Sequence, residues 1–226
     1  IELTNTNNKL LRDLAFKAPG TFQHSLQVAN LAEAAIFKIG GNSLLVRAGA
    51  LYHDIGKMKR PEFFVENQRD GKNIHNTIKP SLSALIITSH TKDGYIMGKQ
   101  NKLPKEILDI ILCHHGTTLV QFFYYKSLEK GEYVIENDFR YSGPKPKSKE
   151  AGIIMLADTI EAAVRVSEDK SREGIENLIR YLIKYKLDDN QMSDSELTLG
   201  EIEKVIQAFL NTLQGAYHNR IKYPSR

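Results

Sequence analysis

Residues 21–41 read TFQHSLQVANLAEAAIFKIGG, and the spacing of the apolar residues in this stretch decides the fold class. From Val28 to Ile39 the apolar side chains recur three or four residues apart, which is the period of an α-helix with one buried face. Gly40 and Gly41 then end the pattern, as glycine commonly does at the C-terminus of a helix. The stretch therefore predicts a long amphipathic helix.

The same periodicity recurs along the rest of the chain. It predicts further helices at residues 43–53, after Pro80, after Pro104, and at residues 119–130, 148–167, 173–186 and 198–217. Alternating polar and apolar residues, the mark of a strand, occur only weakly, at 133–135. Residues 68–80 and 142–149 are polar and rich in turn formers, which predicts loops within one domain. We therefore expect an all-α, single-domain helical bundle over residues 1–226, with residues 1–20 as a lead-in segment.

The composition narrows the class of protein. The 226 residues are 41% hydrophobic and carry a formal net charge of +4, which excludes an intrinsically disordered chain. No run of about 18 apolar residues occurs, so no membrane-spanning helix is predicted. Cys113 is the single cysteine and cannot form a disulfide within the chain. The basic residues are spread along the chain rather than clustered, so a nucleic-acid polymer is not the expected partner.

Several histidines and aspartates fall at positions that the helical pattern assigns to the interior. His24 precedes Val28 by four residues and His114 follows Ile110 by four, so each lies on an apolar helix face. Asp158 directly follows an unbroken apolar run, and a buried carboxylate is costly unless a cation compensates it. The full set of such residues is His24, His53, Asp54, His90, His114, His115 and Asp158.

Each of these residues has an ordinary explanation when it is taken alone. A lone inward histidine is more often a hydrogen-bonded core residue than a ligand, and Asp158 could pair with Arg165. Together, the imidazoles and carboxylates indicate a metal site, because they are natural ligands of iron, manganese and zinc. One ion cannot use all of them and leave room for substrate, whereas two ions that share Asp54 can. Paired ions are typical of phosphoryl-transfer hydrolases, so we expect two divalent ions per chain, with iron or manganese ahead of magnesium and zinc as an alternative.

The segment HDIGK at residues 53–57, with His24 before it and Asp158 far after it, resembles the signature of the HD-domain metal-dependent phosphohydrolases. More narrowly, residues 66–68 (ENQ) and 114–118 (HHGTT) are similar to the cytoplasmic domain of the seven-transmembrane HD family. Members of that family hydrolyse cyclic di-AMP, and the resemblance extends over nearly the whole chain. It implies a helical bundle of the HD-domain type and hydrolysis of cyclic di-AMP to the linear dinucleotide pApA.

The resemblance also implies the roles of the ligands. One ion would be held by His24, His53, Asp54 and Asp158, and the second by Asp54, His90, His114 and His115. Asp54 would bridge the two ions and thereby be catalytic. A hydroxide shared by the ions would attack one phosphorus of the substrate.

Two basic residues are candidates for substrate contact. Lys57 comes three residues after Asp54, at the edge of the ion pair, where its ammonium can meet a phosphate oxygen; we expect it to be both catalytic and substrate-binding. Arg165 lies two helical turns after Asp158 on the same helix face, and it either binds substrate or orients a ligand. The sequence assigns no role to His75, Thr117 or Thr118.

Two other functions stay open. The first is an HD-type hydrolase of another nucleotide, namely cyclic di-GMP, an alarmone or a mononucleotide. The second is a sensor that binds a dinucleotide without cleaving it. Relatives that act on cyclic di-GMP carry a Gly-Tyr-Pro element after the histidine doublet, whereas residues 116–120 read GTTLV here, which favours the adenine dinucleotide.

The resemblance sets expectations about the cellular context. The sequence begins Ile-Glu-Leu without an initiator Met, so we expect a fragment of a longer, membrane-anchored bacterial protein, with this domain in the cytoplasm. Contact with a membrane is expected only through upstream segments. The expected partner is a small cyclic dinucleotide, and a homo-oligomeric state is left open.

Overall fold

The computed structural model describes residues 2–68 and 73–218, except for the side chains of residues 216–218. Within these residues the chain forms α-helices joined by loops and short 3-10 helices, without a named strand, which confirms the predicted all-α class. The α-helices are α1 (Lys9–Lys17), α2 (Pro19–Ile39), α3 (Ser43–Tyr52), α4 (Pro80–Gln100), α5 (Lys105–Cys113), α6 (Gln121–Glu129), α7 (Lys149–Val166), α8 (Arg172–Asp188) and α9 (Leu199–His218). The 3-10 helices are η1 (Glu2–Thr4), η2 (Ile55–Lys59), η3 (Pro61–Phe63), η4 (Val65–Asn67), η5 (Ile74–Asn76) and η6 (Glu136–Phe139).

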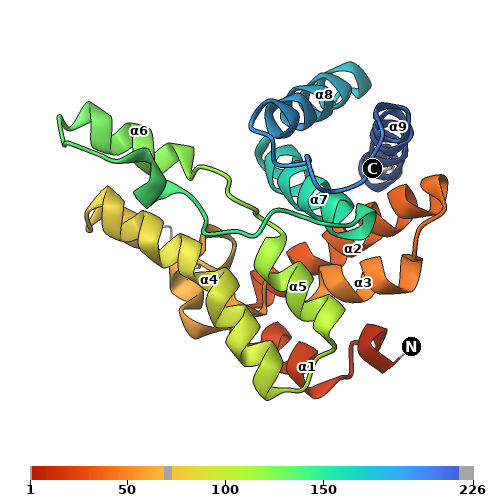
Figure 1. The fold of residues 1–226 in the computed structure, drawn as a ribbon, viewed down its shortest axis with the longest axis horizontal. Helices are drawn as coiled ribbons and strands as arrows, with labels where there is room; N and C mark the ends of the chain where they lie inside the picture. The colour runs from red at the N-terminus through yellow and green to blue at the C-terminus, as the bar shows by residue number, and fades with distance from the viewer. Residues whose placement is uncertain (1, 69–72, 219–226) are drawn as a thin grey trace, which may run out of the picture.

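The hydrophobic core is built around α2, which packs against α1, α3, α7 and α9 (Figure 1). Val28, Ala32 and Ile36 are fully buried, so the apolar face that the sequence predicts is the face that packs. The helix ends at Gly40, whose φ of +81° is readily adopted only by glycine. The most strongly periodic stretch of the sequence therefore forms the central helix of the bundle.

The expected lead-in, residues 1–20, contains a helix that the sequence analysis did not predict. The side chain of Asn8 accepts a hydrogen bond from the backbone amide of Leu10 and caps the start of α1. Leu11 and Leu14 are fully buried in the core. α1 is thus part of the helical bundle rather than a lead-in segment.

α4 and α6 extend to one side of the bundle (Figure 1). α6 packs on α4, on the opposite side from α9, and η6 also lies against both helices (Figure 1). Residues 133–135 form no strand; an isolated antiparallel bridge joins Leu119 and Arg140 instead. The loop predicted at 142–149 is present up to the start of α7, whereas residues 69–72 of the other predicted loop lie outside the described part of the chain.

No helix within the described residues is both long enough and apolar enough to span a bilayer. The ends of α3 and α5 and the sides of α2, α4 and α7 instead meet inside the bundle, where they bring the candidate ligands together.

Candidate metal centre

All seven predicted ligands come together, and each is placed by a helix. α2 carries His24, α4 carries His90 and α7 carries Asp158. The pairs at residues 53–54 and 114–115 directly follow the last residues of α3 and α5. All seven residues are buried except His115, whose side chain is 20% exposed. The helical pattern therefore predicted their inward direction correctly.

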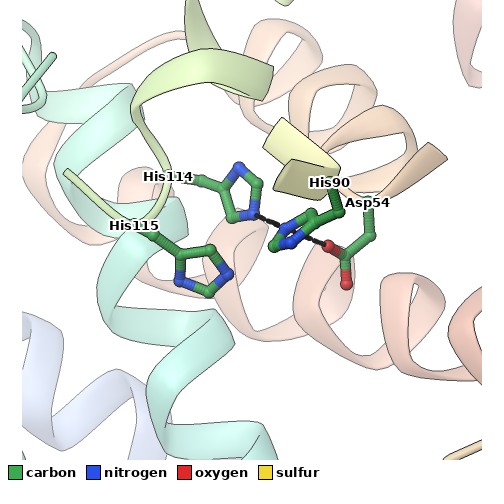
Figure 2. Close-up of side chains that lie close together, drawn as sticks. All are labelled: Asp54, His90, His114 and His115. Atoms are coloured by element: carbon green, nitrogen blue, oxygen red, sulfur yellow. Dashed lines mark hydrogen bonds and ion pairs between the residues drawn. The ribbon is translucent and has the colours of Figure 1, made fainter. Parts of the chain in front are cut away.

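The carboxylate of Asp54 lies between two sets of imidazoles. Its Oδ2 atom is 3.2 Å from Nε2 of His53 and 3.8 Å from Nε2 of His24. Its Oδ1 atom is 3.1 Å from Nε2 of His90 and 3.5 Å from Nε2 of His114 (Figure 2). Each oxygen of this one carboxylate therefore faces a different set of nitrogen ligands.

The potential ligand atoms form two groups, and within each group all of them lie within 4.8 Å of one another. One group consists of His24, His53 and Asp158, and the other consists of Asp54, His90, His114 and His115. The groups adjoin, because Nδ1 of His115 lies 3.6 Å from Oδ2 of Asp158.

Three of the imidazoles are oriented by their own helices. Nδ1 of His53, His90 and His114 donates to the backbone carbonyl three residues earlier, at 2.6, 2.6 and 2.8 Å respectively. Because Nδ1 holds the proton in each neutral ring, the lone pair of Nε2 faces the centre. Nε2 of His90 and Nε2 of His114 are only 3.1 Å apart, an approach that a shared cation makes favourable.

His24 is oriented in a different way. Its Nδ1 atom contacts the carboxylate of Glu161, one turn after Asp158 on α7, while its Nε2 atom lies 2.9 Å from Oδ1 of Asp158. A carboxylate behind a ligating histidine fixes the ring and makes its nitrogen a stronger ligand. Glu161 is not among the site residues predicted from the sequence, although its spacing from Asp158 places it on the same helix face.

The donor set fits a divalent metal-binding site. Oδ1 of Asp54 is buried without a hydrogen-bond partner, which is costly for a polar group unless a cation satisfies it. Imidazole nitrogen and carboxylate oxygen are the ligands that such ions take in proteins.

The electrostatics differ between the two groups. Burial lowers the pKa of His53, but the carboxylates of Asp54 and Asp158 outweigh it and raise the pKa to about 10. Burial lowers the pKa of His114 to about 4, and burial together with His114 lowers the pKa of His115 well below its usual value. Against the effect of burial, Lys57 and His53 hold the pKa of Asp54 well below its ordinary range. The carboxylates are therefore ionised, and the doublet is neutral and ready to bind a metal.

Lys57 lies at the edge of this centre, as predicted. Its Nζ atom is 2.7 Å from Oδ2 of Asp54 and 2.9 Å from Oε1 of Glu66. The hydroxyl of Thr21 donates to the same Glu66 oxygen, at 3.1 Å. η4 is thereby tied to the start of α2, close to His24.

A cavity of about 620 Å³ opens beside the centre, and Lys57 and Arg165 both line it. This volume suits a small-molecule ligand. The wall also contains aromatic residues from η3 and the residue after it, from η5 and α6, and from the loop before α7, namely Phe63, Phe64, His75, Phe122, Phe123 and Tyr141.

The residues without an assigned role now have partners. Nε2 of His75 donates to the backbone carbonyl of Phe63 at 2.7 Å, so this ring supports the cavity wall. The hydroxyl groups of Thr117 and Thr118 contact Gln191 and Lys186, respectively, rather than lining the cavity. Gln191 carries no signal of this contact in the sequence, whereas Lys186 follows Ile179 and Ile183 on an otherwise apolar helix face.

The sequence profile of the HD domain matches residues 21–163, which include all seven candidate ligands. The chain belongs to the HD-domain family. The chain is 50% identical over 224 residues to the cyclic-di-AMP phosphodiesterases PgpH of Bacillus subtilis and Listeria monocytogenes. The match covers 99% of the chain but only 32% and 31% of those relatives, so the chain spans about a third of their length.

Solved structures agree with this assignment. The HD domain of Listeria monocytogenes PgpH superposes with a TM-score of 0.90 at 50% identity, over 94% of this chain and 100% of that one. A structure of the same domain in complex with cyclic-di-AMP gives a TM-score of 0.91 at 49% identity. The predicted HD-type bundle is thereby confirmed.

Proposed function

We propose that this HD domain is a metal-dependent phosphodiesterase that hydrolyses cyclic di-AMP to the linear dinucleotide pApA. The observation that carries the proposal is the buried Asp54 carboxylate, whose two oxygens face separate sets of imidazoles beside an aromatic-lined cavity. The likeness to the PgpH HD domain, which has been crystallised with cyclic-di-AMP, supports the choice of substrate.

Two ions per chain, iron or manganese, are part of the proposal. One would be held by His24, His53, Asp54 and Asp158, and the second by Asp54, His90, His114 and His115. When bound, such an ion pair supplies an activated water and neutralises charge on the reacting phosphate.

The chain's own residues bind and orient the substrate. The ammonium of Lys57 faces both Asp54 and the cavity, so it can donate hydrogen bonds to a phosphate oxygen and offset the charge that develops there. Glu66 holds Lys57 from the other side and keeps the ammonium in place. We assign Arg165, on the same cavity wall, to the second phosphate of the dinucleotide.

The aromatic wall suits the nucleobases. Phe122 is 65% exposed at the cavity, and Phe63 and Phe123 lie around His75. Flat apolar rings of this kind stack on bases, at about 1–3 kcal/mol for each base. Anchoring to a membrane and a cytoplasmic location stay predictions from the sequence resemblance.

A panel of cyclic dinucleotides tests the proposal. The 226-residue chain, loaded with Mn²⁺ or Fe²⁺ without oxygen, is incubated with cyclic di-AMP and with cyclic di-GMP, and the products are separated by chromatography. We expect pApA to form, with slower cleavage of the guanine dinucleotide and none by Asp54→Asn. Preference for cyclic di-GMP would reject the substrate, and binding without cleavage would indicate a sensor.

A further inference from the structure

The loop that carries the histidine doublet is held by a residue from the C-terminal part of the chain. The backbone amide of Thr117 donates to Oε1 of Gln191 at 2.8 Å, and Nε2 of Gln191 donates to the Thr117 hydroxyl at 3.0 Å. Gln191 is only 1% exposed, so both hydrogen bonds are shielded from water. A single buried amide thus fixes the residue two positions after His115.

Gln191 also approaches the loop backbone closely at Gly116. Gly116 has a φ of +53°, and a Cβ atom at this position would lie 2.4 Å from Oε1 of Gln191. Glycine is therefore required here both for its backbone conformation and for the close approach. The turn that ends α8 delivers Gln191, since its amide donates to the carbonyl of Lys186 at 2.9 Å.

Lys186 makes a second contact from the same helix. It continues the apolar face of α8 formed by Ile179 and Ile183, and it is only 4% exposed. Its ammonium donates to the hydroxyl of Thr118 at 2.9 Å. A buried ammonium carries a large desolvation cost, so its retention on an otherwise apolar face indicates a role beyond packing.

A third contact joins the same elements. Nη1 of Arg140 donates to the backbone carbonyl of Thr117 at 2.8 Å, and the guanidinium holds the carboxylate of Asp189 with two contacts of 3.1 Å. Gln191 donates to that same carboxylate at 3.0 Å. The loop and the end of α8 therefore form one connected hydrogen-bond network.

This network matters most for His115. Unlike His53, His90 and His114, this ring makes no hydrogen bond to a carbonyl of its own helix in the part of the chain that the structure describes. Its ring stacks on Tyr141, with centroids 4.3 Å apart, and the direction of its side chain depends on the loop backbone. The loop is in turn fixed by the contacts at Thr117 and Thr118.

We infer that Lys186 and Gln191 are positioning residues that hold His115 in place for the ion assigned to Asp54, His90, His114 and His115. Both lie outside the residues that match the HD domain profile, so the end of α8 adds a support that the family profile does not include. The inference rests on the two-ion part of the proposed function.

Metal titration of two variants tests the inference. Lys186→Met and Gln191→Met remove the polar groups with little change in volume, and Lys184→Met, an exposed lysine on the same helix, is the control. Mn²⁺ is titrated into the metal-free 226-residue chain in competition with a chelator, and thermal unfolding is measured alongside. The two dissociation constants are assigned with His24→Ala and His115→Ala.

We expect both variants to raise one dissociation constant by about 10–100-fold, the range found when the support of a metal ligand is lost. The affected site should be the one that His115→Ala removes, while the site removed by His24→Ala and the behaviour of Lys184→Met stay unchanged. A purely structural role would lower the unfolding temperature and weaken both sites alike, and this result would overturn the inference.

Unchanged dissociation constants in both variants would also overturn the inference, as would a wild-type chain that binds one ion only. The titration measures metal binding and does not measure hydrolysis of a dinucleotide. A wild-type chain that binds two ions but cleaves no dinucleotide would therefore reject the proposed activity and leave the positioning role of Lys186 and Gln191 standing.

Discussion

Binding of metal ions should release protons, mainly from the group that consists of His24, His53 and Asp158. In the metal-free chain the pKa of His53 is about 10, because the carboxylates of Asp54 and Asp158 outweigh the effect of burial. A ligating imidazole is neutral, so an ion that binds His53 at neutral pH must displace its proton. Burial holds the pKa of His114 at about 4, so this ligand has no proton to lose.

The size of the effect follows from these values. At pH 7.5, which is about 2.5 units below the pKa of His53, nearly every His53 ring is protonated, and binding should release about one proton from it. The hydrogen bonds that His24 donates to Asp158 and Glu161 also raise its pKa against the effect of burial, which adds to the release. The affinity of this site should therefore rise at least about tenfold per pH unit between about pH 6.5 and 9.

Calorimetry can count the protons directly. Mn²⁺ is titrated into the metal-free chain at pH 7.5 in two buffers with different heats of ionisation, and the difference in binding heat gives the number released. His53→Ala should release about one proton fewer than the wild type. Binding that releases no protons, or an affinity that is flat over this pH range, would refute the charge states derived for the centre.

Further predictions concern the centre and its surroundings. In the metal-free chain the stabilisation from protonated His53 is fully present below its unfolded-state pKa of about 6.5 and is lost as the pH rises through about 10, so the melting temperature should fall over this range. Asp54→Asn should lower Mn²⁺ affinity by more than the about 100-fold that loss of a ligand's support costs, as measured by chelator competition; near-normal affinity would contradict a bridging role. Arg165→Ala should raise KM for cyclic di-AMP by about tenfold or more with little change in melting temperature, and an unchanged KM would remove it from the substrate site. Gly56→Ala would place a Cβ atom 1.9 Å from the backbone oxygen of His90, so it should lower the free energy of unfolding by about 3 kcal/mol in urea titrations.

The sequence predicts the elements of this fold well because its apolar residues follow one period. The helix expected after Pro104 is α5, and the one expected at 173–186 is α8 with small differences at its ends. α1 was missed because it is short and its flanking residues are polar, although Asn8 and the buried pair Leu11 and Leu14 carry its signal.

The candidate ligands were predictable and most of the residues that support them were not, for a physical reason. An inward histidine interrupts the apolar face around it, so a candidate ligand such as His24 stands out within its own helix. Gln191 interrupts no apolar face, and the only sequence signal of Glu161 is its spacing from Asp158. Their roles arise only when α7 meets α2 and when the end of α8 meets the loop after α5, and these contacts join residues 137 and 74 positions apart, respectively.

The span of the centre along the chain also has a consequence for biosynthesis. His24 and Asp158, which lie 2.9 Å apart, are separated by 134 residues. At about 5–20 residues per second, a ribosome needs about 7 to 27 s to add Asp158 after His24. Throughout that interval the nascent chain lacks Asp158, which completes the group of His24, His53 and Asp158. Under the proposed ligand assignment, the ion of His24, His53, Asp54 and Asp158 can be bound only after α7 has docked, so the ions available at that time would decide which metal this site acquires.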